Sequence, residues 1–386
     1  MVEVVVVGAG IAGVAAALEL AARGAAVNLV EESRPASAAT GASAGMLAPQ
    51  YESPGPGPVY RLGVRSRTEW SAFAERLETL GGRSLGVRRD GMLVANWTGA
   101  EEEEARTACE WQRESGATAE LLTPAEARDL QEGLGPDARS WLWLPDEGQV
   151  DAQRLVEVFE AVLRATGIRL LSGVRVRDVA VEGGAAAGVV MEDGRRVEGD
   201  RVVLAAGAWS GRIGGPGATV PVRPVRGQML RFEGGPGLRR LVASHAGRYL
   251  VPRDAGSVVA GSTMEDAGFD RSITEEGERA IRSSADRLDG GHHHPGPDVE
   301  PLEPEGDPGV QQELVRRVGL ERAVFVAGAE PQVLRLCVDR GADGLTLEGL
   351  AEGEAHGHPQ LVQSSQVLIP DTGHGADRWL EQVQLV

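Results

Sequence analysis

The chain opens with an apolar stretch that runs directly into three spaced glycines. Residues 4–7 are all valine, and Gly8, Gly10 and Gly13 follow within the sequence VVVGAGIAG. Successive β-branched residues are typical of a strand that is buried on both faces. Residues 11–23 are mostly strong helix formers, so we expect a helix directly after the glycines. The opening therefore predicts a strand, a tight turn and a helix.

Each glycine of this G-x-G-x-x-G spacing has a mechanical function in a dinucleotide-binding turn. Gly8 permits the tight turn, Gly10 lets the backbone approach a pyrophosphate, and Gly13 lets the helix pack closely on the strand. The pyrophosphate would lie at the first helical turn, at Ile11 and Ala12, where backbone N–H groups and the helix dipole favour an anion. The alternative is a chance spacing, in a chain that contains 53 glycines.

An acidic residue at the expected distance favours the dinucleotide interpretation over chance. Residues 26–31 (AVNLVE) predict a second strand, which ends at Glu31, 18 residues after Gly13. A carboxylate in this place accepts hydrogen bonds from the ribose hydroxyls and repels a 2′-phosphate, which disfavours NADP. Two strands joined by a helix imply a parallel sheet. The motif alone does not separate FAD from NAD.

Charge and composition exclude several classes of partner. The net charge of −18 argues against nucleic acid and against anionic membranes. All 39 basic residues are arginine, which excludes chemistry that needs a lysine nucleophile. The two cysteines, Cys109 and Cys337, lack metal-ligand spacing and fit a reducing cytoplasm. No stretch reaches the ~20 apolar residues that span a bilayer, so we expect a soluble cytoplasmic protein.

The remaining sequence predicts a mixture of helices and two kinds of strand. We expect helices at residues 62–80, 101–132 and 151–166, and strands within residues 168–181 and 188–191. Residues 201–211 (RVVLAAGAWSG) repeat the opening pattern of an apolar strand that runs into glycine. Residues 220–263 have mixed polarity and predict an antiparallel sheet.

Five stretches of the sequence carry a resemblance to a known family. They are ATGASAGMLAP (39–49), VDAQRLVEVFEAVLRATG (150–167), DRVVLAAGAWSG (200–211), PVRPVRGQML (221–230) and YLVPRDAGSVVAGSTM (249–264). Together they resemble the glycine oxidases of thiamine biosynthesis, which belong to the D-amino-acid oxidase family of flavoproteins. The resemblance covers residues 2–288 in order and identifies the expected cofactor as FAD.

The resemblance implies an α/β fold with two domains. A Rossmann-like FAD-binding domain with a parallel sheet would be discontinuous, and an antiparallel-sheet domain would bind the substrate. We assign residues 1–50, 148–218 and about 318–350 to the first domain, residues 51–147 and 219–288 to the second, and residues 289–317 and 351–386 to an irregular tail.

The same resemblance assigns site residues beyond the glycine turn and Glu31. The positions implied for the cofactor are the loop residues Thr40, Ser43, Ala44, Gly45 and Met46, together with Val176, Ala206 and Gly207. Tyr249 would hydrogen-bond a substrate carboxylate, and Met264 would line a pocket for a very small amine. The alternatives are that Met46 and Met264 fill a core and that Tyr249 is an interfacial aromatic residue.

The implied activity is oxidative deamination of glycine or a similar small amino acid to the imine or glyoxylate, with oxygen reduced to hydrogen peroxide. Two alternatives stay open: a flavin-dependent dehydrogenase of sarcosine or D-amino acids, and a flavin-binding protein without turnover. The oligomeric state also stays open, with a homo-oligomer among the alternatives. We expect no metal, because the histidines at 292–294 have no other ligands near them and lie in a breaker-rich loop.

The last hundred residues depart from the family pattern. The family continues with a Trp-x-Gly-x-Arg-Pro-x-Thr segment, whose arginine binds the substrate carboxylate, and then with a Gly-His turn at the flavin. Neither follows here, because Ala329-Glu330-Pro331 stands after the strand predicted at 323–327. Arg316, Arg317 and Arg322 are the available substitutes for the arginine. One hypothesis is a single-base frameshift near codon 288, which the coding DNA would test.

Overall fold

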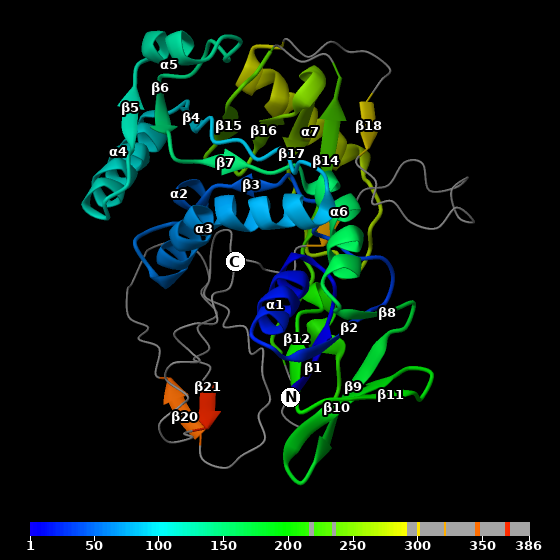
Figure 1. Cartoon of the computed structure of the whole chain (residues 1–386). Helices are drawn as coiled ribbons and strands as arrows, with labels where there is room; N and C mark the ends of the chain where they lie inside the picture. The colour runs from blue at the N-terminus through cyan, green and yellow to red at the C-terminus, as the bar shows by residue number, and fades with distance from the viewer. Residues whose placement is uncertain are drawn as a thin grey trace.

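The computed structural model describes residues 1–215, 220–233 and 237–291, together with four short strands further on (Figure 1). Those strands are β18 (Val299–Pro301), β19 (Leu320–Glu321), β20 (Gly344–Leu347) and β21 (Val367–Pro370). The described chain contains two main sheets, which lie in the lower and upper halves of Figure 1.

The first sheet is the parallel sheet that the opening motif predicts. Its strands are β1 (Glu3–Val7), β2 (Ala26–Glu31), β8 (Arg169–Ser172) and β12 (Arg201–Leu204), in the order β12-β1-β2-β8. All three neighbouring pairs are parallel. Helix α1 (Ile11–Ala22) makes the crossover from β1 to β2, so the predicted βαβ unit is confirmed.

Both faces of the parallel sheet are covered, which explains why β1 is apolar throughout. On one face, Val4 and Val6 pack with α1, α3 (Pro58–Gly81) and α6 (Ala152–Ala165). On the other face, Val5 and Val7 pack against an antiparallel sheet of three strands. Those strands are β9 (Val176–Glu182), β10 (Ala185–Met191) and β11 (Arg196–Glu198).

The second sheet has eight strands in the order β18-β14-β17-β16-β15-β4-β6-β5. Their bounds, beyond that of β18, are β14 (Met229–Phe232), β17 (Val258–Gly261), β16 (Tyr249–Pro252), β15 (Leu241–Ser244), β4 (Met92–Asn96), β6 (Ser140–Leu144) and β5 (Glu120–Leu122). Neighbouring strands are antiparallel except β15 and β4, which are parallel. The antiparallel character predicted for residues 220–263 is therefore confirmed.

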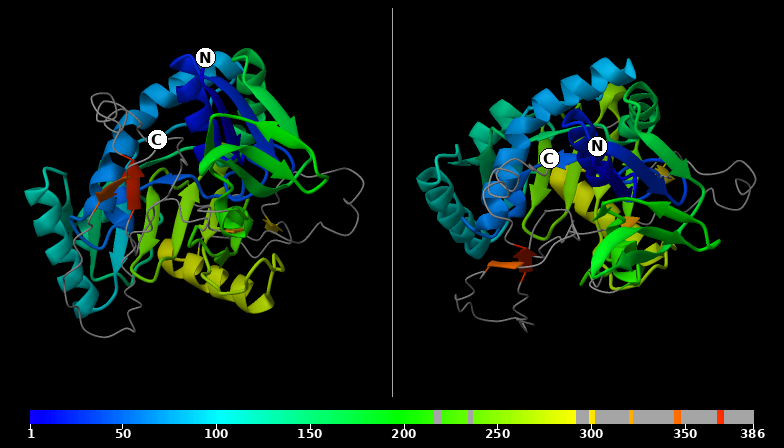
Figure 2. Two further views of the ribbon diagram at one scale, coloured as in Figure 1. Left: turned by 90° about the horizontal axis from the view of Figure 1, so that it is seen from below. Right: turned by 60° about the horizontal axis from the view of Figure 1, so that its bottom comes forward.

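Side chains alternate between the two faces of this large sheet. Tyr249 and Val251 lie on the face that meets the loop before α2 (Pro49–Glu52), in a core that also contains Ala44 and part of α4 (Gly99–Glu114). Leu250 lies on the opposite face, which α5 (Pro124–Leu130) and α7 (Glu275–Asp289) cover. In the left view of Figure 2, the yellow α7 lies on the side of this sheet away from the blue N-terminal elements.

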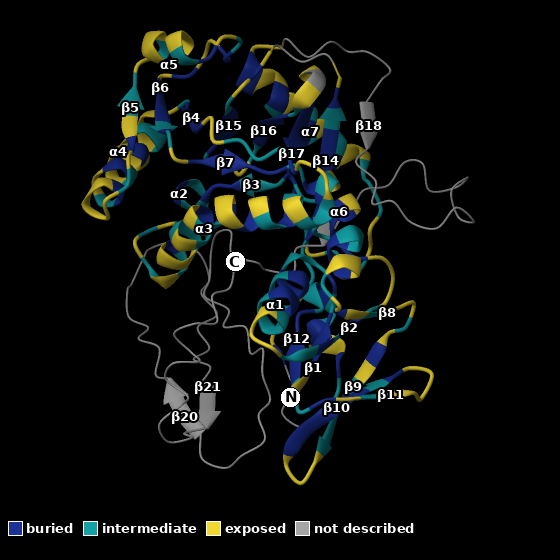
Figure 3. Cartoon of the chain, in the orientation of Figure 1, coloured by how far each residue is buried: buried dark blue, intermediate teal, exposed yellow. Residues whose placement is uncertain are grey.

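The remaining elements are short. They are β3 (Met46–Leu47) paired with β7 (Gly148–Gln149), β13 (Arg226–Gly227) paired with β19, β20 paired with β21, and the 3-10 helices η1 (Gly207–Arg212) and η2 (Asp254–Gly256). Buried residues concentrate in the strands of both large sheets and on the inner faces of the helices (Figure 3). No described helix is long and apolar enough to cross a membrane.

One predicted helix is interrupted in the structure. Residues 101–132 were expected to be helical, but α4 ends at Glu114 and α5 begins at Pro124, with strand β5 between them. Gly116 has a φ of +84°, which a right-handed helix does not accommodate. Thr123 then starts a new helix through a capping box with Glu126. The helix predicted at residues 101–132 is therefore two helices, separated by a glycine that ends the first and a capping box that starts the second.

Several sequence-based expectations lie outside the described residues. They concern the strand at 323–327, the substitutes Arg316, Arg317 and Arg322, Glu330, Cys337, the histidines at 292–294, and most of the proposed tail and of the segment at 318–350.

Candidate active site

The glycine turn brings backbone segments so close together that side chains do not fit. Gly8 has a φ of +99°, and a Cβ there would collide with the carbonyl oxygen of Ala205 at the end of β12. A Cβ on Gly13 would collide with the carbonyl oxygen of Gly8. Gly8 is therefore required by the close approach of Ala205, and Gly13 by the close packing of α1 on the turn.

Glu31 lies beside this turn, where the sequence motif places it. One carboxylate oxygen accepts a hydrogen bond from the backbone N–H of Ala9 at 2.7 Å, and the other accepts from the N–H of Ser33 at 2.9 Å. The carboxylate at the end of β2 is thus fixed against the first residues of the glycine turn. This position matches that of an acid that binds the ribose of a dinucleotide.

The loop of small residues folds back onto the same turn. The hydroxyl of Thr40 accepts a hydrogen bond from the N–H of Ile11 at 3.0 Å, and it lies 3.2 Å from where a Cβ on Gly10 would stand. The hydroxyl of Ser43 donates to the carbonyl of Thr40 at 2.9 Å. The structure therefore brings together two segments that lie about thirty residues apart in the sequence.

Two more sequence-predicted positions surround the parallel sheet. Ala206 is the residue before η1, and its Cα would lie 2.8 Å from a Cβ on Gly8, so the Ala206-Gly207 pair adjoins the glycine turn. Val176 is the buried first residue of β9, and it packs with the residues of β1 that face away from α1.

Tyr249 is buried on the face of the large sheet that meets the loop. Its hydroxyl donates a hydrogen bond to the sulfur of Met229 at 3.2 Å. Ala44 belongs to the same apolar core, and Met46 packs against that core. The residues predicted for the cofactor and the tyrosine predicted for the substrate therefore meet where the loop contacts the sheet.

Met264 lies in a different environment. Its side chain is 66% exposed, so the alternative that it fills a core is wrong. The neighbouring Glu265 is anchored, because Arg226 donates to its carboxylate at 2.5 Å and Gln228 donates to it at 2.5 Å. Hydrogen bonds from the side chains of Thr263, Arg226 and Gln228 lower the pKa of Glu265, although partial burial, the largest single effect, opposes this shift. The segment that carries Met264 is thus held to β13 and to Gln228, which lies between β13 and β14.

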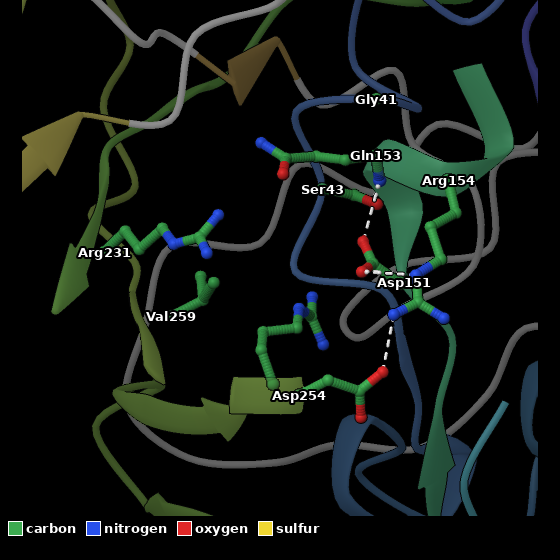
Figure 4. Close-up of a pocket in the computed structure, with 9 residues that line it drawn as sticks. Gly41, Ser43, Asp151, Gln153, Arg154, Arg231, Asp254 and Val259 are labelled. Atoms are coloured by element: carbon green, nitrogen blue, oxygen red, sulfur yellow. Dashed lines mark hydrogen bonds and ion pairs between the residues drawn. The ribbon is translucent and has the colours of Figure 1, made fainter. Parts of the chain in front are cut away.

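A pocket of about 240 Å³ lies between the loop and the large sheet (Figure 4). The residues that line it are Gly41, Ser43, Asp151, Gln153, Arg154, Arg231, Arg253, Asp254 and Val259. Three guanidinium groups therefore meet two carboxylates around one cavity. In Figure 4 the side chain of Arg231 points from its strand into this space.

Sequence analysis missed Arg253, which reaches from the large sheet to the loop. Its guanidinium donates to the side-chain oxygen of Gln149 at 2.5 Å and to the carbonyl oxygen of Ala44 at 2.7 Å. Burial lowers the pKa of Arg253. Arg253 stands in the stretch YLVPRDAGSVVAGSTM that carries the family resemblance, but no local pattern marks it as a partner of the loop.

A buried polar network behind the loop was also missed. Arg67 on α3 and Glu147 before β7 form an ion pair of 3.2 Å, and both side chains are almost fully buried. Glu147 also accepts a hydrogen bond from the backbone N–H of Gln50 at 2.6 Å. Burial raises the pKa of Glu147 to about 7, against the opposing effects of Arg67 and of the backbone donors. No spacing in the sequence connects residues so far apart.

The parallel sheet with its glycine turn, together with the antiparallel sheet that meets the loop, defines a dinucleotide-dependent enzyme fold. The chain belongs to the FAD dependent oxidoreductase (DAO) family, whose model matches residues 3–319. Glu31, the glycine turn and Thr40 fit FAD, since Gly8 and Gly13 have no room for a side chain and the carboxylate of Glu31 lies beside the turn, as the dinucleotide motif requires.

Within this family, the chain is similar to proteins named as glycine oxidases or ThiO/ThiG. The chain is 34% identical over 290 residues to the bifunctional protein ThiO/ThiG of Nostoc sp.. The matched region covers 74% of this chain but only 43% of that relative. It is 32% identical to the glycine oxidase of Pseudomonas aeruginosa, over 74% of this chain and 78% of that relative. The chain thus spans less than half the length of the bifunctional relative.

Solved structures agree on the fold. The glycine oxidase from Geobacillus kaustophilus matches with a TM-score of 0.71 at 24% identity, over 84% of this chain and 90% of that one. The glycine oxidase from Bacillus cereus matches with a TM-score of 0.68 at 25% identity, over 75% of this chain and 78% of that one. The predicted α/β class, with a Rossmann-like parallel sheet and a second antiparallel sheet, is confirmed.

Proposed function

We propose that this chain catalyses the FAD-dependent oxidative deamination of glycine or another small amino acid, with oxygen as the electron acceptor. The observation that carries this proposal is that one loop contacts both the glycine turn and the core around Tyr249. Thr40 of the loop contacts the glycine turn, while Ala44 of the same loop packs in the core that contains Tyr249. The likeness to glycine oxidases over about three quarters of the chain supports the choice of substrate.

The cofactor side of the proposed site uses backbone more than side chains. Gly8, Gly10 and Gly13, with Ile11 and Ala12 at the start of α1, would hold the pyrophosphate, and Glu31 would hold the ribose. The loop residues Thr40, Ser43, Ala44, Gly45 and Met46 would pass along the flavin, and Val176, Ala206 and Gly207 would complete the cofactor site.

On the substrate side, the hydroxyl of Tyr249 would donate a hydrogen bond to the substrate carboxylate, in place of its hydrogen bond to the sulfur of Met229. Met264 would limit the size of the substrate side chain. Bound FAD would supply the two-electron redox chemistry. The substrate loses two electrons and two protons to become an imine, which water converts to glyoxylate and ammonia, and oxygen takes up the electrons and protons as hydrogen peroxide.

A place in thiamine biosynthesis and a cytoplasmic location belong to the same proposal, and they rest on the relatives. We also propose that residues 1–50 and 148–218 form an FAD-binding domain with the segment at about 318–350, and that residues 51–147 and 219–288 form a substrate domain. The strands of the parallel sheet support the first two ranges of the FAD-binding domain, and β4–β6 and β14–β17 of the large sheet support the substrate domain.

An anaerobic titration tests the function. Purified protein reconstituted with FAD is mixed with glycine, sarcosine or D-alanine without oxygen, and the flavin absorption is recorded. We expect glycine to bleach the flavin, and re-aeration to restore it with release of hydrogen peroxide. Bleaching without peroxide on re-aeration would indicate a dehydrogenase instead. Binding of FAD without bleaching by any of the three amines would leave only a flavin-binding protein and would refute the proposed activity.

A further inference from the structure

Arg253 lies where the large sheet meets the loop at 40–46. It directly follows β16, and because side chains alternate along a strand, it shares the face of Tyr249 and Val251. Its own backbone is fixed, since its N–H donates to the carbonyl of Ser257 at 2.8 Å across the turn that contains η2. The Cα of Arg253, from which the side chain extends, is therefore held in place at the end of β16 in the large sheet.

Both oxygens that accept from Arg253 belong to the loop or to the strand paired with it. One is the carbonyl of Ala44, at 2.7 Å from the guanidinium. The other is the side chain of Gln149, at 2.5 Å, and Gln149 pairs with Met46 in the β3–β7 ribbon. The guanidinium of Arg253 thus holds Ala44 directly and Met46 through Gln149. It connects both residues to the sheet that carries Tyr249.

The charges around the pocket distinguish Arg253 from the other two arginines that line it, Arg154 and Arg231, which are labelled in Figure 4. Arg154 pairs with Asp151 at 3.3 Å and with Asp254 at 2.5 Å, and Arg231 pairs with Glu233 at 2.7 Å. The two acceptors of Arg253 are uncharged oxygens. Its contacts therefore depend on the two-pronged geometry of the guanidinium more than on charge pairing.

We infer that Arg253 is a positioning residue, which fixes the loop at Ala44–Met46 against the substrate sheet and thereby sets the place of the flavin relative to Tyr249. This inference rests on the proposed function, because the loop is assigned to the flavin there. A lysine at this position has a compact ammonium on a flexible stem and lacks the rigid fork, so Arg253→Lys should loosen the loop while keeping the charge.

The test compares Arg253→Lys with Arg231→Gln, which lines the same pocket but pairs only with Glu233 among the described residues. Each protein is stripped of FAD and titrated with it, and three quantities are measured. They are the dissociation constant of FAD, the visible absorption bands of the bound flavin at saturation, and the melting temperature of the apoprotein. Gln149→Leu, which removes one of the two acceptors, serves as a second variant if Arg253→Lys does not fold.

We expect FAD to bind about tenfold more weakly to Arg253→Lys, because a lysine lacks the rigid fork that holds both Ala44 and Gln149, so that binding must also order the loop. The absorption bands of the bound flavin should shift, whereas Arg231→Gln should match the wild type in both measurements. Wild-type affinity and bands in Arg253→Lys would overturn the inference. A lower melting temperature with unshifted bands would also overturn it, because that result indicates a purely structural role. If the wild type itself binds no FAD, the proposed function is refuted, and the inference about Arg253 is refuted with it.

Discussion

Tyr249 and Gly261 face each other across β16 and β17 so closely that a Cβ on Gly261 would lie 2.7 Å from the tyrosine hydroxyl. The same Cβ would lie 2.8 Å from Cγ of Met229, whose sulfur accepts the hydrogen bond of that hydroxyl. The absence of a side chain at position 261 therefore determines where the hydroxyl of Tyr249 lies.

Gly261→Ala should move the hydroxyl of Tyr249. Overpacking of this kind costs about 1–3 kcal/mol, so urea unfolding should show a loss of stability of that size. The Michaelis constant for glycine should rise, because the proposed carboxylate donor no longer stands in place. An alanine variant with unchanged stability and an unchanged Michaelis constant would show that Gly261 does not determine the position of the Tyr249 hydroxyl.

Tyr249→Phe isolates the hydroxyl from the ring. The ring keeps its packing, so the melting temperature should change little, while the Michaelis constant for glycine should rise about tenfold, the effect of one lost hydrogen bond to a charged group. Tyr51→Phe is the control, because the hydroxyl of Tyr51 donates to the backbone carbonyl of Ser244 at 2.8 Å. That variant should leave the Michaelis constant unchanged. Equal effects of both variants on the Michaelis constant would contradict the role assigned to Tyr249.

Gly13→Ala should disrupt the packing of α1 on β1. The added methyl would collide with the carbonyl oxygen of Gly8, and a backbone atom cannot move aside as a flexible side chain does. We expect a loss of roughly 2–4 kcal/mol in stability, together with loss of FAD binding. Gly99→Ala is the matched control, since a Cβ at the start of α4 would meet no atom within 4 Å. It should be neutral or slightly stabilising, as judged by urea unfolding.

The buried pair of Glu147 and Arg67 predicts a pH dependence of stability. Burial raises the pKa of Glu147 from the usual 4.5 to about 7, so between these values the folded state binds more protons than the unfolded state. This contribution to the free energy of unfolding is therefore full below about pH 4.5 and is lost as the pH rises toward 7. At 1.36 kcal/mol per pKa unit, its ceiling is about 3 kcal/mol.

The pH prediction is measured by urea unfolding of the wild type and Glu147→Gln at several values between pH 5 and 8. The stability of the wild type relative to the variant should fall as the pH rises. Glu126→Gln is the control, because hydrogen bonds from the backbone and side chain of Thr123 lower the pKa of the exposed Glu126 and keep its titration below this range. Parallel stability curves for the wild type and Glu147→Gln would contradict the raised pKa.

The sequence by itself determined the nucleotide half of this protein. The glycine spacing, the valine strand and Glu31 are local signals, since each depends on residues within about thirty positions of one another. Such signals survive without knowledge of the fold, because a strand, a turn and a helix form from neighbours in the chain. The antiparallel sheet was predictable in kind from the mixed polarity of residues 220–263, although not in its strand order.

Only the tertiary structure decided which distant side chains meet. Arg253 reaches Ala44 across more than two hundred residues, and Arg67 meets Glu147 from another element. These contacts depend on how two sheets and a loop pack together. The periodicity of the sequence predicts local elements but not this packing. The same holds for Met264, which sequence reasoning could equally assign to a core, and whose exposure follows from its place beyond the end of β17. Local signals identified a dinucleotide-binding turn, and long-range packing placed the residues around it.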